Sequence, residues 1–368
     1  MPQRFQYTPT FDGLRGIAIL CVLLAHASPV FKGGWVGVDL FFVLSGYLIT
    51  SLLQNEYYAS GKISFAKFYA RRALRLLPPL FICLAIANVL WPYTPDYYAI
   101  ANQLLATLAG LFYFANVVPW EVLGLLQHLW SLSVEEQFYL VWPVIASTFL
   151  FHTALRNRVF ILTLTIFLIA AFRIFIFHFT RRFFFTLTFG LFVIDSYTFT
   201  VCRMDAIVMG SLLAVVLSHN DNVTCRKNVS IHWSLGICLC LLAAVVLFVP
   251  ESNRYWRNGG FIFTDLLCLY IVAIAAKNPN QPLLSSSILL WIGRRSYGLY
   301  LFHLPIFLAL AILIREHSPV NYLLVTALRF AATIAVAEVS YRFVERPVLR
   351  YKKRYQVASE FVIAQQTS

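Results

Sequence analysis

Residues 14–27 read LRGIAILCVLLAHA, and residues 35–53 read WVGVDLFFVLSGYLITSLL. The first stretch belongs to a largely apolar run over 14–31, and each run is close to the roughly 20 residues that a helix needs to cross about 30 Å of hydrocarbon. Their apolar residues do not alternate with polar ones, which argues against a transmembrane β-barrel. The two stretches therefore predict a pair of membrane-spanning helices.

Similar stretches recur along the 368 residues, of which 60% are hydrophobic and 12% charged. A soluble domain carries about 25% charged residues, so these proportions exclude an ordinary cytosolic enzyme, a disordered chain and a secreted disulfide scaffold. We predict an all-α fold, a polytopic bundle of about ten transmembrane helices, with an eleventh span as the alternative. The expected spans are 14–31, 35–53, 76–93, 129–151, 159–178, 203–218, 232–250, 260–276, 296–314 and 321–341.

The basic side chains favour ten spans over eleven. The chain has 29 Lys and Arg against 16 Asp and Glu. With ten spans and the N-terminus in the cytoplasm, nineteen of the basic residues fall in cytoplasmic loops or the tail, and six fall in outside loops. This asymmetry follows the positive-inside rule. We therefore expect both termini in the cytoplasm and residues 100–118 as a re-entrant or interfacial segment on the outer side.

The chain reads as one membrane domain over residues 1–347 and a short basic tail over 348–368. The tail is too short to fold alone. Residues 25–27 resemble a signal-peptide cleavage site, but the acidic Asp12 upstream is atypical of such a leader. Membrane topology accounts for the net charge of +13 without a nucleic-acid partner, and the seven Cys lack metal-type spacing, so we expect no metal site.

Ionisable side chains inside spans cost about 2.5–3.5 kcal/mol each at mid-helix, which makes them candidates for function. Arg15 and His26 are eleven residues apart, about three helical turns plus 20°, so they share one helix face about 16 Å apart along the axis. An imidazole can take a proton near neutral pH. The alternative is a structural histidine and an arginine that reaches the membrane surface.

Two further groups lie at the ends of the next spans. Asp39 could pair with His26 across the short hairpin, and a helix-capping role is equally consistent with its position. Arg71, Arg72 and Arg75 converge at the cytoplasmic end of the third span. Guanidinium groups suit phosphate oxygens, which indicates an anion site, although positive-inside topology alone is the alternative.

His128 directly precedes the fourth predicted span, and Ser131 and Glu135 follow on the same helix face at i+3 and i+7. Glu136 stands beside Glu135, and Tyr139 follows one turn later. Two adjacent carboxylates entering a membrane helix are difficult to explain by packing. This group is therefore the second strong candidate for a site.

Later spans add isolated polar residues. Arg203 and Asp205 are most simply an interface pair. Tyr297 and His303 lie in the ninth expected span, where Pro305 makes a role in lining a kink as plausible for His303 as chemistry.

In their order along the chain, these blocks resemble the integral-membrane acyltransferase family 3, from Phe11 to about Pro347. The blocks are Phe11-Asp12-Gly13-Leu14-Arg15-Gly16 with His26, residues 37–47, Arg71 to Pro78, residues 128–139, Arg203-x-Asp205 with Gly210, residues 296–303 and Phe343-Val344-Glu345-Arg346-Pro347. The resemblance implies transfer of an acyl group, most often acetyl from acetyl-CoA, to a hydroxyl. It also implies that His26 is catalytic and that the arginine block holds the CoA phosphates. Some larger members carry an appended extracytoplasmic domain, which we do not expect here because the chain ends soon after Pro347.

We therefore expect acyl-CoA to dock from the cytoplasm on Arg71, Arg72 and Arg75. His26 would deprotonate the acceptor hydroxyl, with Arg15 in the same pore and Asp39 or Glu135 orienting the imidazole. An acyl-histidine intermediate is the variant. The expected substrate pore contains Asp12, His128, Ser131, Glu136, Tyr139, Arg203, Asp205, Tyr297 and His303.

The expected acceptor is a bacterial surface polysaccharide or its lipid-linked precursor, either O-antigen or exopolysaccharide, handled in the inner membrane. Acylation of a macrolide or another small molecule is the alternative within the enzyme class. A proton-coupled transporter is the competing class, since buried ionisable residues also mark transport pathways, although no repeated halves are visible. A structural or assembly partner in a glycan-synthesis complex is the third class of function. Acyl length and oligomeric state are left open by the sequence.

Overall fold

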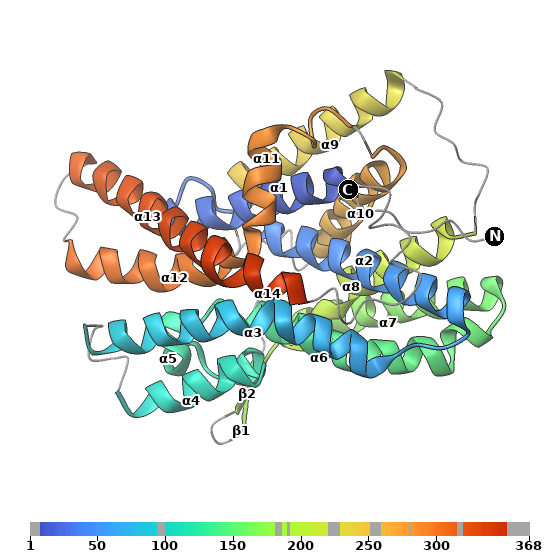
Figure 1. Cartoon of the computed structure of the whole chain (residues 1–368), viewed down its shortest axis with the longest axis horizontal. Coiled ribbons are helices and arrows are strands. Elements are labelled where there is room, and N and C mark those ends of the chain that lie inside the picture. Colours follow the sequence, from blue (N-terminus) through green and yellow to red (C-terminus); the bar gives the residue numbers. More distant parts are fainter. Residues whose placement is uncertain are drawn as a thin grey trace.

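The computed structural model describes residues 8–93, 100–180, 186–189, 192–219, 229–250, 259–279, 281–314 and 319–351. The basic tail from residue 352 onward lies outside them. Each of the ten expected spans coincides with a helix over most of its described length, and Figure 1 shows the helices packed side by side in one bundle. These helices are α1 (Pro9–Ala27), α2 (Val36–Ser60), α3 (Phe65–Leu90), α6 (Leu129–Thr148), α7 (Leu155–Thr180), α8 (Thr200–Leu217), α9 (Val229–Phe248), α10 (Phe261–Lys277), α12 (Ser296–Leu313) and α13 (Pro319–Ser340).

Six helices are long and apolar enough to cross a membrane by length and composition, as judged over the described residues. They are Pro9–Ala27, Val36–Ser60, Phe65–Tyr93, Leu155–Ile176, Thr200–Leu217 and Asn321–Tyr351. The short helix α11 (Ser287–Arg294) meets α12 at 68°, and this bent pair makes a seventh if it is one span. The helical-bundle class is therefore confirmed, whereas the number of ten spans stays a prediction.

The segment expected to be re-entrant contains α4 (Ile100–Leu111), which is about 18 Å long and too short to cross the hydrocarbon. Short turns η2 (Ala115–Val117), α5 (Trp120–Leu123) and η3 (Gly124–Leu126) return the chain to α6. A side chain of α6 satisfies part of the irregular backbone between α4 and η2, because the Gln137 amide donates a hydrogen bond to the Tyr113 carbonyl at 2.9 Å. Irregular backbone at membrane depth is tolerated where protein buries it, so this geometry fits a re-entrant segment.

Helices α2 and α8 approach more closely than side chains would allow. A Cβ added at Gly46 would lie 1.8 Å from the Ile207 carbonyl oxygen, and one at Gly210 would lie 2.0 Å from the Val43 oxygen. Small residues at such crossings let two backbones pack directly, as in many membrane proteins. This contact holds α2, which carries Asp39 and Ser45, in a fixed register against α8.

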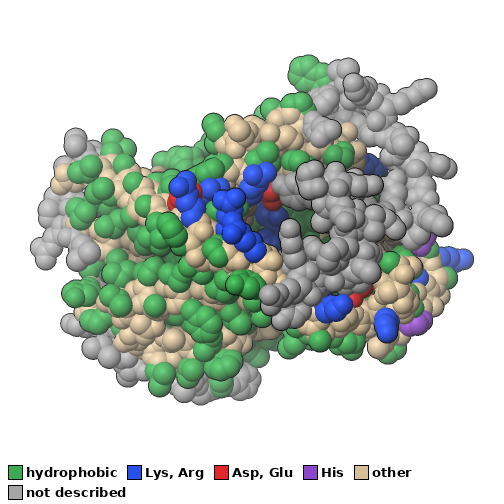
Figure 2. All heavy atoms as spheres, in the orientation of Figure 1, with side chains coloured by type: hydrophobic (Ala, Val, Ile, Leu, Met, Phe, Trp, Pro, Cys, Tyr) green, Lys and Arg blue, Asp and Glu red, His purple; other side chains and the backbone are tan. Residues whose placement is uncertain are grey.

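Apolar side chains cover much of the described surface on the face seen in Figure 2, where they are green. On α7, Phe160 and Phe167 are each 65% exposed, and on α9, Trp233 is 72% exposed. Exposed apolar surface of this extent marks a membrane-facing exterior rather than a soluble one. The protein is therefore a multi-pass membrane protein.

The remaining elements are small. A β-hairpin pairs β1 (Thr186–Phe189) with β2 (Phe192–Asp195) in antiparallel register, with Thr186 opposite Asp195. The turns η1 (Trp91–Tyr93) and η4 (Leu150–His152) follow α3 and α6. At the C-terminal end, α13 continues through the π-helical turn η6 (Tyr341–Glu345) into α14 (Arg346–Tyr351).

Candidate functional site

A cavity of about 470 Å³ opens between α1, α2, α3, α6 and α12. Its wall includes apolar side chains such as Phe41, Ile49 and Leu132, so it combines an apolar channel with a charged side. Nine of the residues expected at the site lie on this wall: Asp12, Arg15, Arg71, Arg72, Arg75, Ser131, Glu135, Tyr139 and Tyr297. The packing thus gathers residues from five helices around one space.

The three arginines of α3 differ in their partners. Arg71 pairs with Glu56 at 3.4 Å, and Arg72 pairs with Glu136 at 2.9 Å and lies 3.5 Å over the Tyr139 ring. Among the described residues Arg75 has neither an ion pair nor a hydrogen bond, and its side chain is exposed to the cavity. Of the three guanidinium groups, Arg75 is therefore the one open to an incoming anion.

The N-terminal turn of α1 forms the adjacent wall. Arg15 donates to Asp12 at 3.0 Å, and Asp12 also faces Arg294 at 3.6 Å. Arg15 therefore adds positive charge to the wall that holds Arg75, while Asp12 fixes its direction. Figure 2 shows further Lys and Arg side chains gathered on the surface between α11 and α14.

His26 lies at the other end of α1 and is not among the residues that line this cavity. Its Nδ1–H donates to the Val22 carbonyl at 2.9 Å, and the residue is exposed. A carbonyl oxygen can only accept, so the neutral ring keeps its lone pair on Nε2. Nε2 is thus the ring nitrogen that is available to accept a proton.

The two carboxylates expected to orient His26 have other partners. Asp39 accepts from Arg203 at 2.5 Å, and Glu135 accepts from the Ser45 hydroxyl at 2.8 Å. Within the part of the chain that the structure describes, neither carboxylate contacts His26. The expected carboxylate–histidine pairing is therefore wrong, because the backbone carbonyl of Val22 occupies the ring nitrogen that a carboxylate would take.

Arg203 and Asp205 do not form the expected interface pair with each other. Arg203 binds Asp39, whereas the two terminal guanidinium nitrogens of Arg173 contact the Asp205 carboxylate at 2.6 and 2.9 Å. All four side chains are at most 2% exposed, and Asp265 is buried beside them. Sequence reasoning passed over Arg173 and Asp265, although an ionisable residue inside a span was the signal that could have found them.

Two histidines expected in the pore join His26 instead. The ring of His303 lies 5.0 Å from that of His26 and 5.2 Å from that of His128, measured between centroids. Tyr300 connects this group to the cavity, since its hydroxyl contacts Ser131 at 2.6 Å and donates to the His128 carbonyl at 2.7 Å. The three imidazoles thus adjoin the inner wall of the cavity without lining it.

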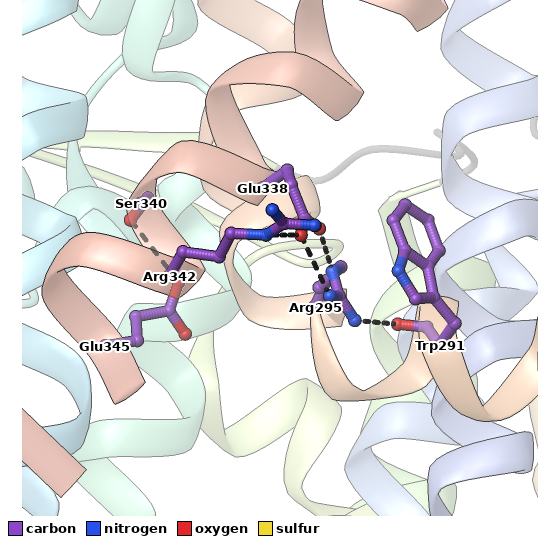
Figure 3. A network of polar contacts seen from close by, with 6 residues as sticks. All are labelled: Trp291, Arg295, Glu338, Ser340, Arg342 and Glu345. Carbon is purple, nitrogen blue, oxygen red and sulfur yellow. Dashed lines mark hydrogen bonds and ion pairs between the residues drawn. The ribbon is translucent and has the colours of Figure 1, made fainter. Parts of the chain in front are cut away.

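A second polar network fixes the bend between α11 and α12. Figure 3 shows Arg295 and Arg342 both pointing at the Glu338 carboxylate, and Arg295 also donating to the Trp291 carbonyl. The Arg295 guanidinium lies 4.3 Å from the Trp291 ring and 4.5 Å from the Tyr341 ring. Ser296 and Tyr297, which follow directly, line the cavity. The network therefore positions part of the cavity wall.

The region that forms this site matches a known protein family. A family model described as an acyltransferase domain matches residues 9–339. The chain belongs to acyltransferase family 3. The match covers every helix that lines the cavity, and it confirms the resemblance drawn from the ordered sequence blocks. No solved structure matches the chain significantly.

Curated relatives of this acyltransferase domain are bacterial. An O-acetyltransferase OatA of Staphylococcus aureus is 32% identical over 363 residues. A peptidoglycan O-acetyltransferase OatA of Listeria monocytogenes is 30% identical, and a putative peptidoglycan O-acetyltransferase YrhL of Bacillus subtilis is 31% identical. These alignments cover 93–97% of this chain but 55–59% of the relatives. The chain thus spans somewhat more than half their length.

Proposed function

We propose that this protein transfers an acyl group, acetyl in the first place, from acyl-CoA to a hydroxyl of a bacterial cell-surface glycan or its lipid-linked precursor. The observation that carries the proposal is the cavity whose charged side holds the open Arg75 beside Arg15. Charged guanidinium groups at the mouth of an apolar channel suit a donor with phosphates at one end and a thin acyl arm at the other.

Acyl-CoA is the proposed co-substrate, and we place the arginine side of the cavity at the cytoplasmic face. The phosphates would bind Arg75 first, with Arg71 and Arg72 beside it. The acyl arm would follow the apolar wall toward Ser131 and Tyr300. The same assignment places both termini in the cytoplasm and the protein in the bacterial inner membrane.

His26 is the proposed general base. Its Nε2 lone pair would remove the proton of the acceptor hydroxyl as the oxygen attacks the thioester carbonyl carbon, and the C–S bond would then break. The exposed position of His26 supports approach of the acceptor from the side away from the arginines. In the variant with an acyl-histidine intermediate, the same Nε2 lone pair attacks the thioester carbonyl carbon instead of removing a proton.

The proposed acceptor is a hydroxyl of a glycan. The names of the relatives point to peptidoglycan for two of them. O-antigen and exopolysaccharide precursors carry the same hydroxyl chemistry, and a macrolide is the small-molecule alternative. A hydroxyl on a polysaccharide, whichever glycan carries it, is the substrate class that we propose.

The test uses purified protein in nanodiscs with acetyl-CoA, and it follows the free thiol of CoA with and without glycan extracts. The panel contains peptidoglycan, O-antigen and exopolysaccharide fractions and a macrolide. We expect glycan-dependent thiol release that disappears in His26→Ala, with the variant still inserted and monodisperse. Release that persists in His26→Ala would exclude this base, and the absence of release with acetyl-CoA, longer acyl-CoAs and every acceptor would exclude the transferase.

A proton-coupled transporter is the second candidate. The buried carboxylates of Asp39, Asp205 and Asp265 outnumber their two arginine partners, and such groups also occur in proton pathways. Proton flux into protein-loaded vesicles without acyl-CoA turnover would favour this candidate.

A further inference from the structure

Three imidazoles from distant parts of the chain lie in one group. His26 comes from the end of α1, His128 immediately precedes α6, and His303 belongs to α12. His303 is in the middle, with ring centroids of 5.0 and 5.2 Å to the other two and interplanar angles of 67° and 74°. His128 is 3% exposed and His303 is 0% exposed.

Each ring has one nitrogen on a backbone carbonyl. His26 donates from Nδ1 to Val22, His128 donates from Nε2 to Leu301 at 3.0 Å, and His303 donates from Nδ1 to Tyr300 at 2.5 Å. The carbonyls can only accept, so in the neutral rings the opposite nitrogens carry lone pairs. The His128 Nδ1 and the His303 Nε2 are buried without a hydrogen-bond partner.

A buried acceptor without a donor is costly, and such orphans call for an explanation. A resident metal ion does not supply one, because no three His, Cys, Asp or Glu side chains in the described part of the chain are arranged to hold one. A proton on one imidazole supplies an explanation, because it turns an acceptor nitrogen of that ring into a donor to the neighbouring ring.

Few other ionisable groups face the cluster. Tyr300 packs against His303 and His128, with ring centroids 5.5 Å from each. From α13, Tyr322 and Arg329 donate to the carbonyls of Ala27 and Phe307, near the cluster but on backbone atoms. No carboxylate is bonded to any of the three rings among the residues with described side chains.

We propose that His303 is a positioning residue that shares the proton taken up by His26, while His128 packs against its other side in the same cluster. This inference rests on the proposed function. His26 Nε2 removes the acceptor proton, and once the acceptor oxygen has left this N–H for the acyl carbon, the N–H is free to donate to the orphan lone pair of His303. The imidazolium is then stabilised by an imidazole where other hydrolytic and transfer enzymes use a carboxylate.

The step balances without any further reactant. The acceptor O–H bond breaks as the N–H bond forms on His26, and the acceptor oxygen forms the new bond to the acyl carbon. The C–S bond breaks with its electron pair on sulfur. The proton leaves the imidazole cluster for this thiolate, which gives free CoA thiol and restores three neutral rings.

The first test does not depend on turnover. Diethyl pyrocarbonate reacts with neutral imidazole, so carbethoxylation of His26 against pH, read by peptide mass spectrometry, reports its protonation in the full-length protein in detergent. A hydrogen bond to the charged form favours that form. We therefore expect the labelling midpoint to move down by about one pH unit in His303→Phe, and to recover partly in His303→Gln, which retains an acceptor oxygen. Coincident midpoints in the wild type and His303→Phe would overturn the proposal.

The second test is turnover with acetyl-CoA and glycan. Loss of a partner that stabilises the general base should lower kcat by about 100-fold or more while the KM for acetyl-CoA changes less than about threefold. Phe302→Leu, a buried change in the same helix, is the matched packing control and should retain most of kcat. If kcat is unchanged in His303→Phe, the proposal fails. If the wild type shows no turnover, the proposed function fails and the labelling test still decides on proton sharing. His303→Asn, which keeps the donor toward Tyr300, replaces His303→Phe should the latter not fold.

Discussion

Arg203 and Asp39, 164 residues apart in sequence, form an ion pair of 2.5 Å in which both side chains are at most 2% exposed. The Arg203 guanidinium is also surrounded by aromatic rings and lies 4.5 Å from that of Phe261. The pair joins α2 to α8 and removes Asp39 from the neighbourhood of His26. Its consequences for stability can be measured.

Removal of one partner leaves the other charge buried and uncompensated, which costs about 3–5 kcal/mol in proteins. We expect Asp39→Leu to lower the thermal unfolding midpoint strongly in detergent. Replacing both partners, as in Asp39→Leu with Arg203→Met, should recover most of the loss because no orphan charge remains. A double variant no more stable than the single one would contradict this account.

The open guanidinium of Arg75 predicts a specific effect on donor binding. Hydrogen bonds to charged groups contribute about 1.5–3 kcal/mol, so Arg75→Ala should raise the KM for acetyl-CoA by roughly 10- to 100-fold. Arg71 and Arg72, which already bind carboxylates, should show smaller effects on KM. Arg156→Ala, at an exposed position on α7, is the matched control. Equal changes of the KM for acetyl-CoA in Arg75→Ala and Arg156→Ala would show that the cavity does not bind the donor.

Glycine positions allow a matched test of helix packing. An alanine Cβ at Gly46 would overlap the Ile207 carbonyl oxygen, whereas one at Gly236 meets nothing within 4 Å. We expect Gly46→Ala to reduce the yield of folded protein and Gly236→Ala to leave it unchanged, since alanine favours a helix interior by about 1 kcal/mol. Size-exclusion profiles of the two variants supply the comparison, and similar profiles would show that α2 and α8 can separate.

The network at the α11–α12 bend predicts a different signature. Glu338→Gln removes the carboxylate that binds both Arg295 and Arg342. Because Ser296 and Tyr297 follow the bend and line the cavity, we expect a KM for acetyl-CoA that rises about 3- to 10-fold, as for loss of one hydrogen bond of about 1 kcal/mol. Glu338→Asp, which keeps the charge, should recover part of this loss. An unchanged KM in Glu338→Gln would show that the bend holds its shape without the network.

Membrane orientation can be tested with two exposed positions. Val30, 60% exposed, lies in the loop between α1 and α2, and Lys62 follows α2 at the other end. With the N-terminus in the cytoplasm, Val30→Cys should react with a membrane-impermeant maleimide in intact spheroplasts, and Lys62→Cys only after permeabilisation. The cysteine-matched parent corrects for native thiols, and the reverse pattern would invert the proposed orientation.

The sequence by itself determined the bundle and the charged residues of the cavity wall. Long apolar runs can satisfy their backbone groups in a bilayer only as helices, so the ten helical segments could be placed from composition and length. Ionisable residues within those runs are costly, which singled out Arg15, the α3 arginines and Glu135 before any contact was known. The spacing of these residues also predicted which ones share a helix face.

Only the tertiary structure decided which of these groups meet. Asp39 binds Arg203 rather than His26, and His303 approaches His26 from 277 positions farther along the chain. Such pairings depend on the depth and rotation at which each helix packs, and on close crossings such as that of Gly46 with Ile207. Helical periodicity fixes the face of its own helix on which a residue lies, and this can be read directly from the sequence. Packing between helices fixes which residue of another helix it meets, and this depends on the whole fold.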